Sequence, residues 1–283
     1  MIISLGLLIF LSGCSTSAKM KRGKVTPTDF HEQIHFQTAK GLMLIPCELE
    51  GQTKNYLFDT GAQVTGIQRT VLKGKRVTVR GATNRTVENG TEVLKSFKIR
   101  TINFQKTFAT NGDMVGLKEQ IPNFGGILGR TIIDRANWLI DHPKKEVIIS
   151  NKDLSDESFT DIPLLDQSSG APYTMIELDG KTYKAILDLG SIAELNVPED
   201  HPLAKVLMEA YTFEDQARER YTVGGLQSII QKVGQLPSVK INGREFKDIG
   251  VAINKSSQLR IGMNFFKAHM LYVDNLNKKY RVK

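Results

Sequence analysis

The sequence contains little cysteine, little proline and no long apolar segment. Two Cys residues allow at most one intramolecular disulfide, so no disulfide framework holds the fold. Nine Pro and a charged fraction of 24% argue against a disordered chain, and the lack of a heptad or collagen period argues against a fibre. No segment supplies the roughly 20 apolar residues that a membrane-spanning helix needs. What remains is a globular chain of 283 residues, long enough for one large or two small domains.

Several common chemistries are also missing. The five His residues never flank a Glu at zinc-ligand spacing, and neither a Gly-x-Ser-x-Gly elbow nor a phosphate-binding Gly loop occurs. We therefore expect no metal and no cofactor. The net charge is +8, and the excess lies in the first half, but the basic residues are scattered without interleaved aromatics. This pattern favours a solvated face, and we expect no nucleic-acid partner.

The N-terminus reads as a targeting segment. Residues 1–13, MIISLGLLIFLSG, are uncharged and too short to span a bilayer, which suits a signal peptide. Leu11-Ser12-Gly13-Cys14 resembles the lipobox of bacterial lipoproteins, which implies cleavage before Cys14 and lipid attachment to its thiol. Residues 14–30 are polar and basic, as expected of a flexible tether. The protein would then be anchored in the bacterial cell envelope, periplasmic or associated with the outer membrane. An ordinary apolar N-terminus that happens to end in Cys remains the alternative.

An internal repeat is the main feature of the rest of the chain. ELEGQTKNYLFDTGA (48–62) aligns without a gap with ELDGKTYKAILDLGS (177–191), at an offset of 129. ILGRTIIDRANWLIDHPKKEVIIS (127–150) aligns with RIGMNFFKAHMLYVDNLNKKYRVK (260–283), at an offset of 133. The chain is therefore a duplicated unit of about 120 residues, with a polar and acidic junction at 151–161.

The repeat unit is mostly strand by its pattern. Short or alternating apolar runs are bounded by Gly, Asn or paired Lys, as in 56–58, 97–102 and 147–149. Helical patterns are few: 131–136, the equivalent 264–269, and 202–211. An all-β fold with short helices is predicted. The lone Cys47, in the strand-like run LMLIPCELEG, is interpreted as a buried structural thiol rather than a nucleophile.

Asp59-Thr60-Gly61 follows Leu57-Phe58 and precedes Ile127-Leu128-Gly129 by about 70 residues. These residues resemble the aspartic peptidases of the retropepsin and pepsin type, and the duplication resembles bacterial bilobal retropepsin-like proteins. The resemblance covers nearly all of the mature chain. It implies two acid-protease β-barrel lobes, an N-terminal lobe at 31–151 and a C-terminal lobe at 160–283.

The resemblance implies a catalytic pair, Asp59 and Asp188. Two carboxyls about 3 Å apart share one proton, so that one can take a proton from water while the other donates to the substrate carbonyl. Gly61 and Gly190 would let the backbone turn sharply and bring amide donors to the carboxylates. Thr60 would form hydrogen bonds across the two loops and fix their geometry.

The second copy departs from the family at Leu189, which stands where Thr or Ser is usual, so the hydroxyl network is expected to be one-sided. Ser191 could orient Asp188 through its hydroxyl. The alternative is that Asp188 is merely a polar residue in a lobe that has lost activity. Flap hairpins are expected near Gly81 and near Gly224 and Gly225, although ordinary hairpin turns would give the same pattern.

These observations predict a membrane-anchored aspartic endopeptidase whose partner is a polypeptide substrate and whose N-terminal lipid contacts the membrane. Two alternatives stay open. One is a catalytically inactive module of the same fold that binds peptides or an envelope protein. The other is a homodimeric enzyme that pairs Asp59 from two chains. The distance between the two carboxyl groups tests the first choice, because a two-lobed enzyme needs Asp59 and Asp188 within hydrogen-bonding reach of each other in one chain.

Overall fold

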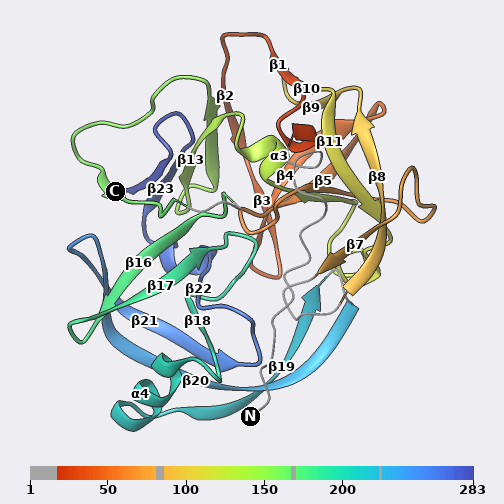
Figure 1. The fold of residues 1–283 in the computed structure, drawn as a ribbon. Coiled ribbons are helices and arrows are strands. Elements are labelled where there is room, and N and C mark those ends of the chain that lie inside the picture. Colours follow the sequence, from red (N-terminus) through yellow and green to blue (C-terminus); the bar gives the residue numbers. More distant parts are fainter. Residues whose placement is uncertain (1–17, 81–85, 167–169, 223–224) are drawn as a thin grey trace.

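The computed structural model describes residues 18–80, 86–166, 170–222 and 225–283. Most of these residues are in β-strands, and the helices are few and short (Figure 1). The prediction of a mostly β chain is confirmed. In the part of the chain that the structure describes, no helix combines the length and the apolar character needed to cross a bilayer.

The first half of the chain forms an eleven-stranded sheet. Its order is β1-β10-β9-β4-β5-β12-β6-β11-β8-β7, with β3 paired to β4. The strands are β1 (Lys24–Thr26), β3 (Gln37–Ala39), β4 (Leu42–Leu49), β5 (Gln52–Phe58), β6 (Thr65–Gln68), β7 (Val77–Arg80), β8 (Thr86–Leu94), β9 (Phe97–Ile99), β10 (Ile102–Gln105), β11 (Thr107–Gly112) and β12 (Phe124–Leu128).

The second half forms a seven-stranded sheet with the order β16-β17-β22-β18-β21-β20-β19. The strands are β16 (Tyr173–Leu178), β17 (Lys181–Leu187), β18 (Leu195–Pro198), β19 (Glu214–Thr222), β20 (Gly225–Ile241), β21 (Arg244–Asn254) and β22 (Arg260–Ile261). The long β20 pairs with β19 on one side and with β21 on the other, so this sheet extends into a long hairpin.

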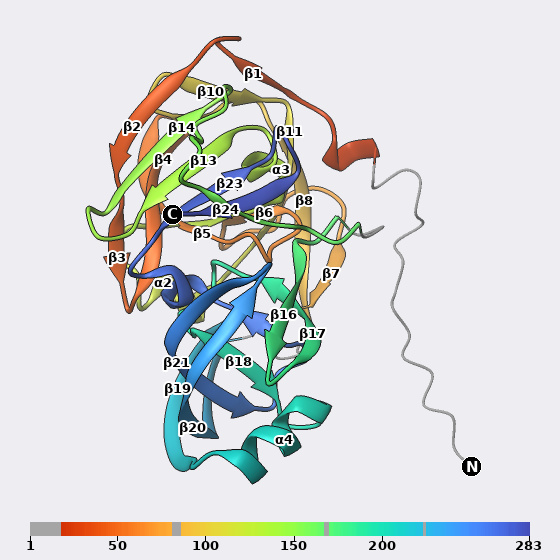
Figure 2. The same ribbon diagram turned by 90° about the vertical axis from the view of Figure 1, so that its left-hand side faces the viewer.

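A third sheet of six strands is built from both halves, which the repeat alone did not predict. Its order is β15-β24-β23-β13-β14-β2, and the pairing of β13 with β23 joins the two halves. The strands are β2 (His31–His35), β13 (Asn137–Asp141), β14 (Glu146–Ser150), β15 (Thr160–Ile162), β23 (Met270–Asp274) and β24 (Lys279–Val282). Figure 2 shows β23 and β24 among first-half strands, apart from the seven-stranded sheet of the second half.

The duplication is visible in the topology. In the first half, β12 runs parallel to β5 and antiparallel to β6, and in the second half β22 runs parallel to β17 and antiparallel to β18. The turns that precede β5 and β17 also match. Glu50 and Gly51 have φ of 54° and 77°, and Asp179 and Gly180 have φ of 50° and 74°. Two consecutive positive φ values are typical of a tight two-residue hairpin, which explains the repeated acidic-Gly pair.

Helices are present at the three places where the sequence pattern predicts them. Helix α3 (Arg130–Ile133) and the 3₁₀ helix η1 (Met263–Phe266) occupy equivalent places after the two Gly residues 129 and 262. Helix α4 (Pro202–Ala210) buries Leu203, Ala204 and Leu207, and the side chain of His201 accepts a hydrogen bond at its N-terminus. Helix α2 (Val115–Lys118) was not predicted.

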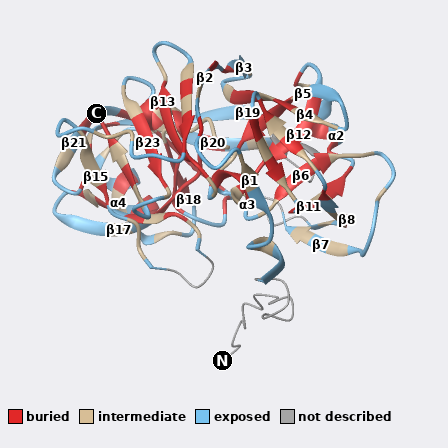
Figure 3. Cartoon of the chain, turned by 90° about the horizontal axis from the view of Figure 1, so that it is seen from above, coloured by how far each residue is buried: buried red, intermediate tan, exposed pale blue. Residues whose placement is uncertain are grey.

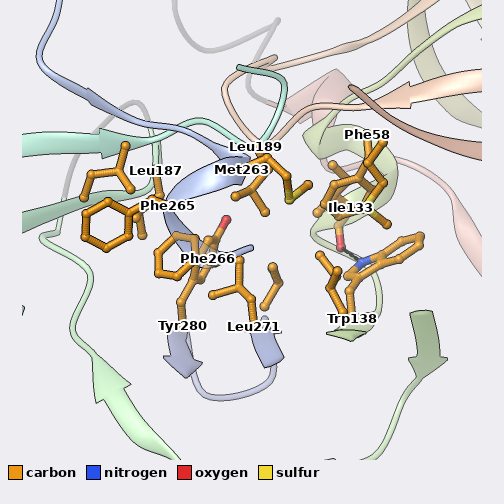
Figure 4. Packing of buried hydrophobic residues seen from close by; sticks show 14 of the residues in the cluster. Phe58, Ile133, Trp138, Leu187, Leu189, Met263, Phe265, Phe266, Leu271 and Tyr280 are labelled. Atoms are coloured by element: carbon orange, nitrogen blue, oxygen red, sulfur yellow. Dashed lines mark hydrogen bonds between the residues drawn. The ribbon is translucent and has the colours of Figure 1, made fainter. Parts of the chain in front are cut away.

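Buried residues follow the strands of both halves, and the exposed ones lie mainly in connections and hairpins (Figure 3). One apolar cluster runs from the first half into the second without a break. Trp138 is fully buried in it, lies edge-on to Phe58, and donates its indole N–H to the carbonyl of Ile133 at 2.8 Å (Figure 4). Trp138 is therefore a core residue.

The prediction of a flexible tether over residues 14–30 is wrong for its C-terminal part. Residues Lys24–Thr26 form β1, which pairs with β10 at the edge of the first sheet. Phe30 is buried and its N–H donates to the side chain of Asn151 at 3.1 Å. Arg135 donates to backbone carbonyls in the 20–23 segment. Long-range contacts order this segment despite its polar sequence, and residues 14–17 lie outside the described part.

Candidate active site

The two aspartates singled out by the repeat occupy equivalent places. Asp59 follows β5 and its N–H donates to the carbonyl of Leu128 at 3.1 Å, while Asp188 follows β17 and its N–H donates to the carbonyl of Ile261 at 2.8 Å. Each strand pairing therefore continues one residue beyond the strand and fixes the start of each Asp loop. Asp59 and Asp188 therefore occupy equivalent positions, each directly after the equivalent strand of its half.

The structure brings the two loops into direct contact. A Cβ on Gly61 would lie 2.8 Å from Cγ of Asp188, and a Cβ on Gly190 would lie 2.4 Å from Cγ of Asp59. Neither glycine has a φ in the left-handed region, so the expected sharp turn is not the reason for them. Glycine is needed because each carboxyl group occupies the space that a side chain of the opposite loop would fill.

Backbone amides bind one oxygen of each carboxyl group, as predicted. Oδ1 of Asp59 accepts from the N–H of Gly61 at 2.8 Å and from the N–H of Ala62 at 3.0 Å. Oδ1 of Asp188 accepts from the N–H of Gly190 at 3.1 Å. These bonds hold each carboxyl group across its own loop and orient it toward the other.

The carboxyl groups of Asp59 and Asp188 interact within one chain. Burial and the neighbouring carboxyl of Asp188, which lies within hydrogen-bonding reach, hold the pKa of Asp59 well above its usual range. Two adjacent carboxyls cannot both ionise at low cost, so they keep a proton between them. Such a pair can act as acid and base at once.

Thr60 joins the loops through backbone groups of the second half. Its hydroxyl donates to the carbonyl of Leu187 at 2.8 Å and accepts from the N–H of Leu189 at 3.0 Å. The bond across the loops is therefore present, as predicted, and it is one-sided. The side chain of Leu189 is fully buried beside Met263 (Figure 4).

Tyr280 of β24 approaches this junction from the shared sheet. It is buried, its hydroxyl lies beside Thr60, and burial raises the pKa of its phenol. No local pattern predicts Tyr280 near the aspartates, because this contact depends on the six-stranded sheet that both halves build.

Arg260 is the site residue that the sequence analysis missed. Its Nε lies 2.7 Å from Oδ2 of Asp188, and the two side chains are only 10% and 12% exposed. The repeat alignment already places Arg260 opposite Ile127 of the first half. The charged residue at a position that is apolar in the first half is the signal in the sequence that points to Arg260.

The expected bond from the Ser191 hydroxyl to Asp188 is not supported. The Oγ of Ser191 instead accepts from the N–H of Ala193 at 3.4 Å. Its backbone ties the loop down, because its carbonyl accepts from the N–H of Met263 at 2.8 Å. Arg260 makes the side-chain contact to Asp188 that was expected of Ser191.

Only part of the expected flaps can be placed. Gly81 and Gly224 lie outside the described residues, and Gly225 is the first residue of β20. All of β19 pairs with residues 225–233 of β20, and helix α2 of the first half packs against both strands. The long hairpin of the second half therefore reaches across to the first half.

The two cysteines are Cys14 and Cys47. Cys14 lies outside the described residues. Cys47 is buried and unpaired, its thiol contacts the carbonyl of Ile45 at 3.4 Å, and burial raises its pKa well above the usual range. A thiol that stays protonated and inaccessible is a poor nucleophile, which agrees with a structural role.

No protein-family model matches the chain, and no curated protein matches it.

Proposed function

We propose that this protein is an aspartic-type endopeptidase of two retropepsin-like lobes, with Asp59 and Asp188 as its catalytic dyad. The observation that carries the proposal is the direct interaction of the two carboxyl groups within one chain. The amide hydrogen bonds to both carboxyls and the Thr60 bridge support it, because they hold the pair in a fixed geometry.

The reaction needs no group beyond the pair and a water molecule. The ionised carboxyl accepts a proton from water as the water oxygen bonds to the peptide carbonyl carbon, and the protonated carboxyl donates its proton to the carbonyl oxygen. In the second step the carboxyl that took the proton from water gives it to the leaving nitrogen, the C–N bond breaks, and a diol O–H returns a proton to the other carboxyl, which restores the starting pair. The substrate is a polypeptide, held between the lobes.

Substitution of each aspartate tests the proposal. Asp59→Asn and Asp188→Asn should each abolish cleavage of a mixed peptide library, because members of one catalytic unit act together. Asp248→Asn is the matched control, since Asp248 is exposed and has a φ of 55°, which Asn tolerates. Full activity of either dyad variant, with the fold retained, would reject the dyad.

Two other functions are outcomes of the same experiment. A peptide-binding module of the same fold is favoured by the ion pair of Asp188 with Arg260, which no symmetric dyad would contain. It predicts binding of extended peptides without cleavage by the wild-type protein. A homodimeric enzyme that pairs Asp59 from two chains predicts that Asp188→Asn remains active.

We further propose that Cys14 carries a lipid that anchors the protein in the bacterial cell envelope. The lipobox-like run at residues 11–14 supports this. The protein should incorporate labelled palmitate and partition into detergent, and Cys14→Ala should remove both properties. Their persistence in the Cys14→Ala protein would reject the anchor.

A further inference from the structure

A single cation touches the dyad among the described residues. Nε of Arg260 lies 2.7 Å from Oδ2 of Asp188, and both side chains are about nine-tenths buried. At this depth a cation and a carboxylate are weakly screened by solvent, so their interaction strongly favours the ionised carboxyl.

The fold directs this cation to one aspartate only. Arg260 on β22 pairs with Ile186 of β17 and with Asn196 of β18. In the first half, Ile127 pairs in the same way with Leu57 of β5 and with Gly66 of β6.

The surroundings of Ile127 differ completely from those of Arg260. Ile127 is buried in a small apolar cluster with Leu57 and Met114, and nothing in that cluster carries a charge. No cation contacts Asp59 among the described residues; its carboxyl accepts hydrogen bonds from two backbone amides and faces the carboxyl of Asp188.

The other titratable and charged groups around the pair do not reverse this asymmetry. Tyr173 of β16 lies near Arg260, and Tyr280 of β24 lies near Asp188 and Thr60. Burial raises the pKa of both phenols, so both are neutral. Arg130 and Asp134 of the α3 region bind each other at 3.0 Å.

We infer that Arg260 is a positioning residue that fixes Asp188 as the ionised member of the pair and leaves the proton on Asp59. Asp59 is buried and faces an ionised neighbour, so ionising it would cost more free energy than ionising Asp188, and the proton stays on Asp59. The assignment concerns the resting protein and applies whether or not it cleaves peptides.

The consequence for catalysis rests on the proposed function. Asp188 is the base that takes the proton from water, and Asp59 is the acid that protonates the carbonyl oxygen. Arg260 acts through Asp188 and keeps this base ionised in acid. Activity should therefore fall on the acid side only at a low pH.

The first test is the pH profile of peptide cleavage by wild type, Arg260→Ile and Arg260→Lys. Ile is the residue that the first half places at the equivalent position. Loss of a nearby opposite charge should move the acid limb of Arg260→Ile upward by about 1 to 3 pH units. Arg260→Lys, which keeps the charge, should restore most of the wild-type profile.

Arg69→Ile is the matched control. It removes an arginine that is 15% exposed from its ion pairs with Glu50 and Glu92, away from the dyad. It should reduce stability and leave the acid limb where it is. A shift of equal size in Arg69→Ile, or an unmoved acid limb in Arg260→Ile, would overturn the inference while the peptidase proposal stands.

The second test reads the proton directly and needs no substrate. Carbon-13 labelling of the Asp carboxyls, with the signals assigned from Asp59→Asn and Asp188→Asn, should show Asp188 ionised and Asp59 protonated at the same pH. The Asp188 signal should keep its ionised position at a pH where Arg260→Ile has lost it. A proton found on Asp188 in the wild-type protein would overturn the inference, even if Arg260→Ile fails to fold. If nothing cleaves any peptide, the proposed function fails and this measurement still decides where the proton lies.

Discussion

The two halves share a topology and differ in the residues around their aspartates. β5, β6 and β12 surround Asp59 as β17, β18 and β22 surround Asp188. The first half contributes a hydroxyl, Thr60, and an apolar neighbour, Ile127. The second half contributes an apolar loop residue, Leu189, and a cation, Arg260. The duplicated scaffold needs only its strand pattern and glycines, so single substitutions are enough to give the two carboxyls different chemistry.

A single hydroxyl, that of Thr60 in the first Asp loop, forms the hydrogen bonds that join the two Asp loops. Thr60 uses its donor and its acceptor capacity on the backbone around Asp188, so the carbonyl of Leu187 and the N–H of Leu189 are both satisfied. A hydroxyl at position 189 is not needed for those bonds. The position is therefore free to serve the core, which is where the Leu189 side chain lies.

The largest expected difference between the halves is in the stability of the two dyad variants. Asp188→Asn removes one partner of a buried ion pair and leaves Arg260 charged, which should cost about 3 to 5 kcal/mol in the free energy of unfolding at neutral pH. Asp59 has a raised pKa, so it stabilises the fold in acid and this contribution is lost as pH rises through its folded-state pKa. Asp59→Asn should flatten that loss and be the more stable variant at neutral pH.

Denaturant unfolding across the acid-to-neutral range measures this difference, with Asp248→Asn as the exposed control. Arg260→Ile combined with Asp188→Asn should recover part of the lost stability, because it removes the unpaired charge. Equal destabilisation by Asp59→Asn and Asp188→Asn at neutral pH would contradict the asymmetry of the site.

Much of this comparison was accessible from the sequence. The apolar alternation and the repeat are local signals, and they gave the mostly β fold, the short helices at 131 and 264, and both aspartates. The contact of Arg260 was not accessible, because a shift of one residue in the register of β22 would turn its side chain to the other face. The shared six-stranded sheet and the docking of β1 depend on pairings between distant segments, which no local pattern encodes.

The next prediction concerns the hydrogen bonds of Thr60, which only the first half contributes. Thr60→Val keeps the shape and removes the hydroxyl, which leaves a buried carbonyl and a buried N–H of the second loop without partners. Each such group costs about 1 to 3 kcal/mol. Denaturant unfolding should show this loss for Thr60→Val and only a small change for Thr60→Ser. An unchanged midpoint for Thr60→Val would mean that the bridge does not hold the loops together.

Leu189→Thr gives the second Asp loop the same residue as the first, and we expect it to lower the stability of the fold rather than raise it. Leu189 has no exposed surface and packs in the core, so a smaller polar side chain loses apolar contacts and buries a hydroxyl. A cost of about 2 kcal/mol in the free energy of unfolding is expected. Leu189→Met is the matched control, because it keeps the volume. A Leu189→Thr protein at least as stable as wild type would show that the second loop can accept the hydroxyl.

The glycines test how closely the loops approach. Gly190→Ala and Gly61→Ala would put a methyl group against the opposite carboxyl, at 2.4 Å and 2.8 Å from Cγ. The pair must then separate, and a displacement of about 1 Å can cost about 100-fold in rate. Gly190→Ala should be the more damaging of the two. Gly250→Ala is the control, because its Cβ would meet Glu194 at an ordinary 3.4 Å.

The smallest expected effect concerns a position where the halves differ without consequence. Cys47 on β4 is equivalent in the repeat to Ile176 on β16, and both are buried. Since the second half fills this place with an aliphatic side chain, Cys47→Val should change the free energy of unfolding by less than about 1.5 kcal/mol and leave the proposed peptidase activity unchanged. In a Cys14→Ala background, where Cys47 is the only thiol, alkylation should be slow in the native protein and fast after unfolding, because burial raises the thiol pKa and blocks access. Rapid alkylation of the native protein, or loss of cleavage in Cys47→Val, would place this thiol in the functional site and give the first half a second reactive group that the other half lacks.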